Sequence, residues 1–329
     1  MSVFISISLF AHGAATGIST GHAFFVTLHA PWIFDVAVKC LHRLDIASDT
    51  LQRAHDFVQE TPLESRNAPS ELPQGWPSTG LVEMQNVRAY YTPNVDARPA
   101  LLDISLTIEP GEHIGIAGRS GSGKSSLLLT LLGFIRYQGS IRIDGVEISS
   151  IVPDVLRSHL VTITEEPVIF DGTVRTNLLP FTMNDPAKQS RRRSLGDEQK
   201  DLELEQLLKR LHIWVPLINK GGLSANVDEV GYSKGDTQLL CIARAIMRQR
   251  ETGCKVILID DATGCLTTHK EKIANDIMSE YFRGCTVLRG SIRESGLEGT
   301  GAVAYLHHGV VVDPNEVDED SELDEEEEP

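Results

Sequence analysis

The sequence predicts an α/β fold in which helices cover a largely parallel sheet. From Leu81 onward, short apolar runs such as 113–117 and 255–260 alternate with helical patterns. Such alternation is typical of parallel sheets, because consecutive parallel strands need a crossover connection that a helix usually supplies. A glycine-rich loop at 118–126 also lies between one apolar run and the helical pattern that follows it. The helical patterns cover 124–134, 201–212 and 236–250.

The composition is that of a globular protein. Of the 329 residues, 41% are hydrophobic and 23% are charged, which excludes wholesale disorder and a polytopic membrane protein. The net charge of −16 arises mainly in residues 313–329, which hold eleven acidic side chains and no basic one, whereas the other 312 residues carry 35 acidic and 30 basic side chains. Because no basic face dominates, we expect no nucleic-acid partner.

The cysteines are scattered and form no CxxC pair. This pattern argues against a disulfide framework or a zinc site, and it favours a reducing compartment. The five positions are Cys40, Cys241, Cys254, Cys265 and Cys285.

The N-terminal 60 residues are predicted to be helical. Residues 1–34 contain no Lys, Arg, Asp or Glu, so the run is long enough to span a bilayer, yet Ser, Thr, Gly and three His dilute it. Composition slightly favours a buried helical hairpin, and the lack of a preceding basic residue argues against a secretory signal. Residues 36–60 predict one amphipathic helix, since apolar residues recur at spacings of three and four. Pro62 is expected to end this helix.

The rest of the chain divides into a linker, a domain and a tail. Residues 61–80 hold four prolines together with Ser, Asn and Gly, which predicts a linker. Residues 81–312 form the α/β domain, whose last stretch, 302–312, predicts a hairpin that turns at His308-Gly309. Residues 313–329 are too charged to bury and are predicted to be a disordered, solvated tail.

The strongest motif is the loop at 118–126, which fits the pattern G-x-x-x-x-G-K-[ST]. Glycines allow the backbone to wrap a phosphate chain, and the helix that follows adds positive potential at its N-terminus. Lys124 is expected to reach the β and γ phosphates, and Ser125 is expected to bind Mg²⁺. The predicted nucleotide-binding residues of the loop are Gly118, Arg119, Ser120, Gly121, Ser122, Gly123, Lys124, Ser125 and Ser126.

A second motif carries a pair of acids. Four apolar residues, 256–259, lead directly into Asp260 and Asp261. A buried strand that ends in an acid is the Walker B arrangement, in which Asp260 would bind Mg²⁺ directly or through water. The alternative is an acid pair that only caps the next helix. The presence of the loop at 118–126 argues against this alternative.

At these motifs the sequence resembles the nucleotide-binding domain of an ATP-binding cassette (ABC) transporter, over about residues 15–312. The run Tyr232-Ser233-Lys234-Gly235-Asp236 begins its Ser 27 residues before Asp260, where the family has its LSGGQ signature. The helix from Thr237 to Ala245 resembles the helix after that signature. Tyr91 lies upstream, where the family stacks an aromatic ring on adenine. The segments 101–106 and 172–178 also match family patterns.

More narrowly, the sequence resembles the second nucleotide-binding domain of fungal subfamily C exporters, the multidrug-resistance-associated-protein type. This resemblance rests on Arg119, Ser120 and the run 220–223. Residues 1–60 then resemble the end of the last transmembrane helix and its cytoplasmic extension. The implied fold is a P-loop NTPase domain of the ABC type with a helical subdomain, preceded by a helical remnant of a transmembrane domain.

The resemblance also implies ligands, partners and a location. The ligands are ATP and Mg²⁺, with no other metal, and the Mg²⁺ ligands would be Ser125, Asp260 and Glu165. The partners are a second nucleotide-binding domain, in a head-to-tail dimer, and transmembrane domains. Ser233 and Gly235 would face the partner's site. The location is a membrane, with this domain on the cytoplasmic side.

Several positions depart from the family pattern on the side that performs chemistry. The catalytic Glu after Walker B falls on Asp261, which is one methylene shorter. The family's Gln falls on Glu165, which adds negative charge near the γ-phosphate, and its late His falls on Ile292. Thr267 replaces an Asp, Tyr232 replaces the signature Leu, and Asp236 replaces the signature Gln.

These departures leave three hypotheses open. The first is a slow ATPase that powers transport. The second is a degenerate module or truncated fragment that binds ATP and dimerises without turnover. Phosphate release separates these two. The third, a soluble cassette ATPase without a role in transport, is less favoured because of residues 1–60, and membrane fractionation separates it from the others.

Overall fold

The computed structural model of this chain describes residues 17–61, 72–92, 98–180 and 195–312. The chain divides into two compact units, residues 1–64 and 65–329, and each is described by itself. The predicted disordered tail at 313–329 lies outside the described residues, as do parts of the predicted linker.

The described part of the first unit is one long helix, α2 (Gly17–Glu60), of 44 residues. The predicted helix at 36–60 is its C-terminal half, and α2 ends two residues before Pro62. Within residues 17–34 the chain is also part of α2, so the alternative of a helical hairpin does not hold for that stretch. Pairs four residues apart on its surface are joined by salt bridges, Lys39 to Asp35 at 2.6 Å and Arg53 to Asp49 at 2.9 Å. Of the helices that the structure describes, none has the length and apolar character required to cross a membrane.

The second unit contains the predicted parallel sheet. Its six strands run in the order β10-β9-β3-β8-β7-β6, and all neighbours are parallel except β10 and β9. The antiparallel pair turns at His308 and Gly309, as the sequence predicts. The strands are β3 (His113–Ala117), β6 (Leu160–Ile163), β7 (Val256–Asp260), β8 (Thr286–Ser291), β9 (Ala302–His307) and β10 (Val310–Val312).

A second, four-stranded sheet is antiparallel and was not predicted. Its order is β2-β1-β4-β5, and irregular register interrupts the pairing of β1 with β2 between Met84 and Val87. Such bulges break the strict alternation of buried and exposed residues that identifies a strand in a sequence. The strands are β1 (Val82–Tyr90), β2 (Leu101–Ile108), β4 (Arg136–Ile143) and β5 (Val146–Glu147).

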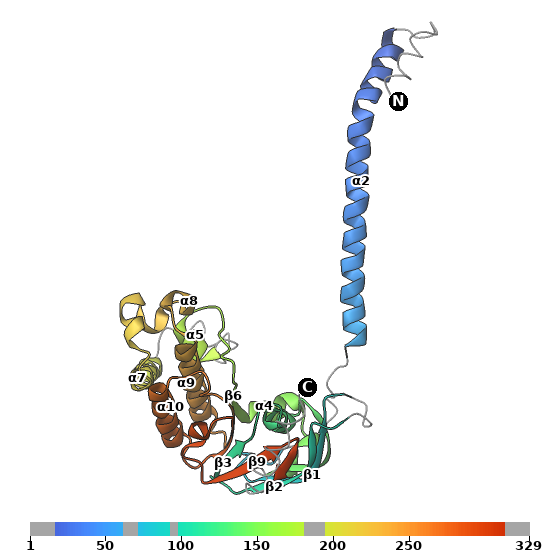
Figure 1. Cartoon of the computed structure of the whole chain (residues 1–329). Helices are drawn as coiled ribbons and strands as arrows, with labels where there is room; N and C mark the ends of the chain where they lie inside the picture. Colours follow the sequence, from blue (N-terminus) through green and yellow to red (C-terminus); the bar gives the residue numbers. More distant parts are fainter. Residues whose placement is uncertain (1–16, 62–71, 93–97, 181–194, 313–329) are drawn as a thin grey trace, which may run out of the picture. The chain divides into compact units, whose positions relative to one another are not determined.

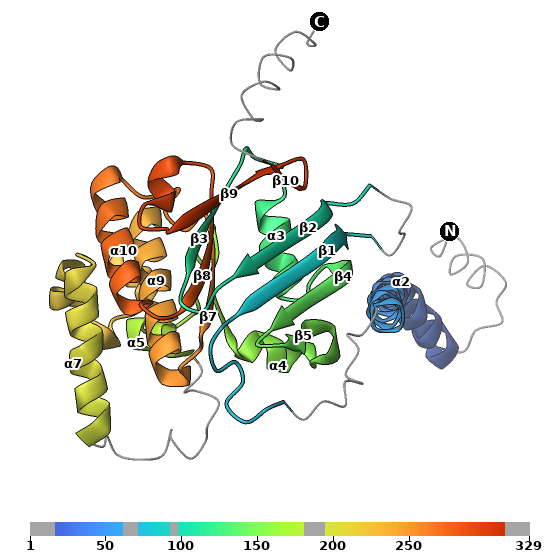
Figure 2. The ribbon, with the colours of Figure 1, turned by 90° about the horizontal axis from the view of Figure 1, so that it is seen from below.

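Helices cover both faces of the parallel sheet. Figure 2 shows α3 (Lys124–Leu131) between the two sheets, where Leu127, Leu128 and Leu131 pack among strand residues from both. On the other side α9 (Lys234–Thr252) and α10 (Thr268–Tyr281) lie against each other. Figure 1 shows α5 (Val174–Leu178), α7 (Leu195–Arg210) and α8 (Val227–Val230) gathered near α9 as a helical subdomain. A short helix, α4 (Pro153–Ser158), precedes β6.

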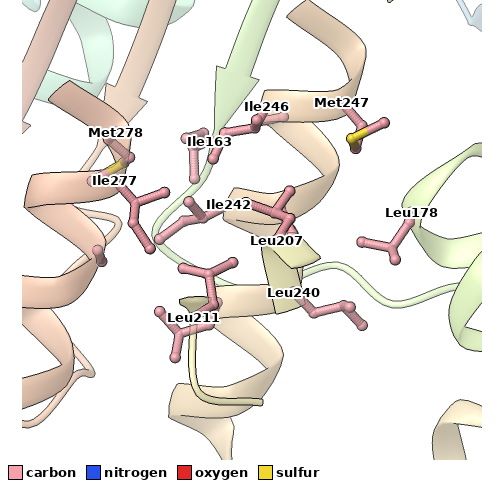
Figure 3. Close-up of a cluster of buried hydrophobic side chains, with 14 of the residues drawn as sticks. Ile163, Leu178, Leu207, Leu211, Leu240, Ile242, Ile246, Met247, Ile277 and Met278 are labelled. Atoms are coloured by element: carbon pink, nitrogen blue, oxygen red, sulfur yellow. The ribbon is translucent and has the colours of Figure 1, made fainter. Parts of the chain in front are cut away.

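The helical subdomain shares one hydrophobic core with strands β6 and β7. Figure 3 shows its side chains converging from α7, α9, α10 and β6. Leu240 and Ile242 of α9 are fully buried in it. This continuous core joins the middle of α9 to the parallel sheet. Members of the cluster are Ile163, Leu178, Leu207, Leu211, Leu240, Ile242, Ile246, Met247, Ile277 and Met278.

The described end of the predicted linker, residues 72–80, is attached to the antiparallel sheet. Trp76 is buried, and its Nε1 donates a hydrogen bond of 2.8 Å to the carbonyl of Ile143. The carboxylate of Asp144 accepts hydrogen bonds from the backbone N–H groups of residues 78 to 81. Burial alone would raise the pKa of Asp144, but the bonds from Thr79, Gly80 and Leu81 lower it overall.

Candidate nucleotide-binding site

The glycine-rich loop lies between β3 and α3, at the carboxyl end of the parallel sheet. Gly118 has no room for a side chain, because a Cβ there would lie 2.4 Å from the carbonyl oxygen of Leu306 and 2.5 Å from Ser122 Oγ. Gly123 caps α3 with a φ of 110°, a left-handed conformation that glycine adopts without strain. The backbone of the loop therefore curls tightly ahead of a helix N-terminus, the geometry that binds phosphate groups.

Lys124 is the first residue of α3, and its ammonium group lies within the loop. The side chain is 7% exposed. Its Nζ donates hydrogen bonds to the carbonyl oxygens of Gly118, at 2.7 Å, and Arg119, at 2.8 Å. Burial lowers the pKa of Lys124, and the nearby carboxylates of the predicted site residues oppose this change. In order of their effect these are Asp260, Asp261 and Glu165.

Asp260 ends β7 and meets Ser125 across the loop. The Ser125 hydroxyl is close enough to the Asp260 carboxylate to lower its pKa. Burial raises the pKa of Asp260, as does the charge of Asp261, while the Ser125 hydroxyl and the Lys124 ammonium oppose the change. A hydroxyl beside a carboxylate supplies the oxygen ligands that Mg²⁺ prefers. Among the residues that the structure describes, no cluster of three or more His, Cys, Asp or Glu side chains could hold a metal alone, so a bound Mg²⁺ would need oxygens from a nucleotide or water as well.

Asp261 follows β7 and is held by hydrogen bonds to the last two residues of β8. Its φ of 37° lies in the left-handed region, which is uncommon for a residue other than glycine. Its backbone N–H donates to the carbonyl of Gly290 at 2.8 Å, and its carboxylate accepts a hydrogen bond of 3.1 Å from Ser291 Oγ. The next residue of the chain after β8 is Ile292, whose side chain is 54% exposed.

Glu165 lies in the turn after β6 and is exposed to solvent. Its carboxylate is close enough to Lys124 to oppose, in small part, the lowering of the Lys124 pKa by burial. The turn is fixed by Gln238 of α9, whose Nε2 donates to the carbonyl of Thr164 at 2.8 Å. Glu165 is thus brought to the same site as the loop and the two aspartates.

Tyr91 follows β1 and lies next to the loop helix. Its side chain is 65% exposed, whereas that of Tyr90 is 8% exposed. The hydroxyl of Tyr91 lies 2.9 Å from Ser126 Oγ, so the two form a hydrogen bond. Of the two adjacent tyrosines, Tyr91 is therefore the one that offers an aromatic face beside the phosphate loop.

The run 232–236 begins α9, and its side chains are engaged with one another. Ser233 caps the helix, and it forms a reciprocal capping box with Asp236. Ser233 Oγ donates to Asp236 Oδ2 at 2.6 Å, and Lys270 of α10 forms a salt bridge of 2.6 Å with the same carboxylate. Ser233 and Gly235 thus lie beside residues 265–270; none of these contacts joins them to the loop at 118–126.

Asp236→Ala should reduce the free energy of unfolding by about 1–2 kcal/mol at pH 7, the usual loss for a helix cap together with its ion pair. Burial alone would raise the pKa of Asp236, but bonds from Lys270 and Ser233 lower it overall. Its contribution is therefore present above the ordinary value of about 3.9 and should shrink as the pH falls below that value. Urea unfolding at several pH values measures it. Asp276→Ala, an exposed position on α10, is the matched control; an equal loss in both variants contradicts the prediction.

Three further residues at or near the site were missed by sequence reasoning. Gln238 and Lys270 are separated in the sequence from the groups they bind by 74 and 34 residues, so no local pattern identifies them. Arg289 is buried in β8, and its Nη1 donates to Asn275 Oδ1 at 3.0 Å. Burial lowers the pKa of Arg289 to about 10. The only feature of the sequence that could have indicated a role for Arg289 is that it is a charged residue within an apolar strand.

The fold and this site define a nucleotide-binding domain of the phosphate-loop class, and comparison with known proteins narrows the class to a family. The family model described as ABC transporter matches residues 101–264. The chain therefore carries an ABC transporter ATP-binding domain, homologous at about 30% identity to fungal transporters and to members of sub-family C.

Three relatives illustrate this homology. The ABC transporter gloK of Glarea lozoyensis is 33% identical over 318 residues, which make up 94% of this chain and 22% of that protein. The ABC transporter ecdL of Aspergillus rugulosus is 30% identical over 272 residues, or 82% of this chain and 17% of that protein. ATP-binding cassette sub-family C member 8 of Rattus norvegicus is 30% identical over 303 residues, 90% and 18% of the two chains. The chain thus spans about a fifth of the length of these relatives.

A solved structure agrees on the fold. A bacterial Atm1-family ABC exporter with ATP bound matches 94% of this chain and 51% of its own, with a TM-score of 0.64 and 22% sequence identity. At that identity the likeness concerns the fold alone. It confirms the predicted α/β fold of the ABC ATPase type, and the long helix α2 precedes that domain in the chain.

Proposed function

We propose that this chain contains the C-terminal nucleotide-binding domain of an exporter of the subfamily C type, and that it binds Mg·ATP in the loop at 118–126. The observation that carries the proposal is the convergence of Lys124, Ser125 and Asp260 at the carboxyl end of the parallel sheet. The family implies ATP and Mg²⁺ binding in general. Bound Mg²⁺ would supply positive charge to the phosphates, and Ser125, Asp260 and Glu165 are the residues that would hold it.

The residues of the site divide the work of binding. Lys124 is a cation inside a curled loop, and it can exchange its bonds to two loop carbonyls for bonds to phosphate oxygens. The backbone N–H groups at the start of α3 and the helix dipole favour the same negative charge. Tyr91 offers an aromatic face for the base. All these groups surround one loop, which is why we assign them to one ligand.

We infer that hydrolysis is slow. Asp261 has the carboxylate needed to orient a water molecule, but it reaches less far than the family's Glu, and it is also held by Ser291. Ile292 has no group that can bond a phosphate. A positioned general base contributes roughly 10²–10⁴ in rate, and a displacement of about 1 Å can cost on the order of 10². These changes leave the binding residues intact, so binding should outlast chemistry.

We infer further that the domain pairs head-to-tail with a second nucleotide-binding domain and acts with transmembrane domains, on the cytoplasmic side of a membrane. Homology to transporters along most of this chain supports this assembly. Ser233 and Gly235 would then face the partner's site. The second candidate function is a module that binds ATP and dimerises without turnover. It is favoured by Asp236, which occupies Ser233 with hydrogen bonds in this chain.

Tyr91→Ala should weaken the affinity for Mg·ATP about tenfold, because stacking of a base on an aromatic ring contributes roughly 1–3 kcal/mol in single-stranded nucleic-acid sites. Tyr91→Trp, which keeps an aromatic face, should lose less affinity than Tyr91→Ala. Isothermal titration calorimetry of the full chain measures both. If Tyr90→Ala reduces affinity while Tyr91→Ala does not, the base lies elsewhere and this part of the site is wrongly assigned.

A further inference from the structure

The hydroxyl of Tyr91 joins the segment after β1 to the first turn of the loop helix. Its Oη lies 2.9 Å from Oγ of Ser126, and either oxygen can donate the proton. Ser126 is the third residue of α3, two positions after Lys124. An exposed aromatic ring is thereby fastened at its far end to the helix whose N-terminus faces the phosphate loop.

The surroundings of Ser126 assign its hydroxyl to Tyr91. The carbonyl oxygen of Ser126 accepts a hydrogen bond of 2.6 Å from Thr130 Oγ1, within the same helix. Its side chain is buried, so the hydroxyl meets Tyr91 rather than solvent. The neighbouring Ser125 lies on the side of the Asp260 carboxylate, whose pKa it lowers. The two consecutive serines therefore face different groups: Ser125 lies near the acid proposed to bind Mg²⁺, and Ser126 bonds the aromatic residue.

The bond has a consequence for the ring. An exposed tyrosine with no polar contact exchanges rotamers on the picosecond to nanosecond scale. Fastening its hydroxyl removes that freedom before a base arrives, and a binding surface ordered in advance loses less entropy when its ligand binds. The hydrogen bond also ties the position of the ring to the same helix that orients Lys124.

We propose that Ser126 is a positioning residue for base recognition: its hydroxyl holds the Tyr91 ring in place to stack on the base of a nucleotide whose phosphates lie in the adjacent loop. This inference rests on the proposed nucleotide-binding function and adds to it a physical link between the base and phosphate ends of the site. It assigns to the tyrosine hydroxyl a role that stacking alone does not require.

The test is a double-mutant cycle on the full chain, with calorimetry of Mg·ATP and of Mg·tripolyphosphate, which has no base. Tyr91→Phe keeps the ring and removes the hydroxyl, and it should weaken ATP binding about two- to tenfold, the range expected for one hydrogen bond. Ser126→Ala should weaken ATP binding by at least that factor. The double variant should be no weaker than the weaker single variant. Ser126→Thr, which keeps a hydroxyl, should restore binding.

The controls separate this proposal from its alternatives. Tyr91→Phe should leave tripolyphosphate binding unchanged, and Tyr90→Phe, at the buried neighbour, should change neither affinity. The inference is overturned if Tyr91→Phe binds ATP as well as or better than the unmodified chain, or if the losses of the two single variants multiply. It is also overturned if Ser126→Ala alone weakens both probes equally. Failure of the proposed function looks different: the unmodified chain then binds neither probe.

Discussion

Lys124→Ala is expected to reduce the affinity for Mg·ATP by at least about a hundredfold. The ammonium group can make two or three charge-assisted hydrogen bonds to phosphate oxygens, and each is worth about 1.5–3 kcal/mol. Its removal also leaves the carboxylates of Asp260, Asp261 and Glu165 without the cation that offsets them. The site would then repel a polyphosphate rather than attract one.

Calorimetry at fixed Mg²⁺ measures this loss, and circular dichroism of the same sample establishes that the domain remains folded. Lys272→Ala is a matched control, since Lys272 is an exposed lysine on α10 and should bind as the unmodified chain does. An unchanged dissociation constant in Lys124→Ala, with the fold intact, would remove the assignment of the loop as a nucleotide site.

The double reversion Asp261→Glu with Ile292→His is expected to raise phosphate release at least about tenfold, a modest part of the range for a positioned general base. Glutamate extends the carboxylate by one methylene beyond the bond to Ser291, and histidine adds a donor at an exposed position beside it. Because neither position belongs to the loop, the affinity for ATP should change little. The assay includes a competent partner domain, since the partner is proposed to supply its own signature helix.

The same double reversion in a Lys124→Ala background provides the control. No gain in phosphate release is expected there, which ties any gain to this site rather than to a contaminating ATPase. Should the unmodified chain already release phosphate at the rate of the reverted one, the departures at Asp261 and Ile292 are harmless, and the chain is an ordinary transporter ATPase.

The parallel sheet and the loop could be predicted from the sequence because both have local signals. A buried parallel strand is a continuous apolar run, as in 256–259, and the loop is a fixed pattern of Gly, Lys and Ser. The antiparallel sheet has no such signal. Its strands are half exposed, and bulged pairing between Met84 and Val87 breaks the alternation on which a strand prediction depends.

The contacts that complete the site could not be predicted for a related reason. The bond between Tyr91 and Ser126 spans 35 residues of sequence, and that between Lys270 and Asp236 spans 34. Each depends on how distant elements pack, which residue spacing does not encode. The sequence could indicate that Asp236 suits a helix N-terminus, but not that a lysine from the next helix neutralises its charge.

The carboxylate of Asp144, which gathers the backbone N–H groups of residues 78 to 81, has a mechanical consequence. Residues 72–81 are attached to the α/β domain by these hydrogen bonds and by the nearby indole of Trp76. The carbonyl of Gly80 in the same segment also accepts a hydrogen bond of 2.6 Å from Thr286 Oγ1 of β8. Residues 78–81 are therefore attached to both sheets, and strain on them would be shared between the antiparallel sheet and the parallel sheet that carries the phosphate loop.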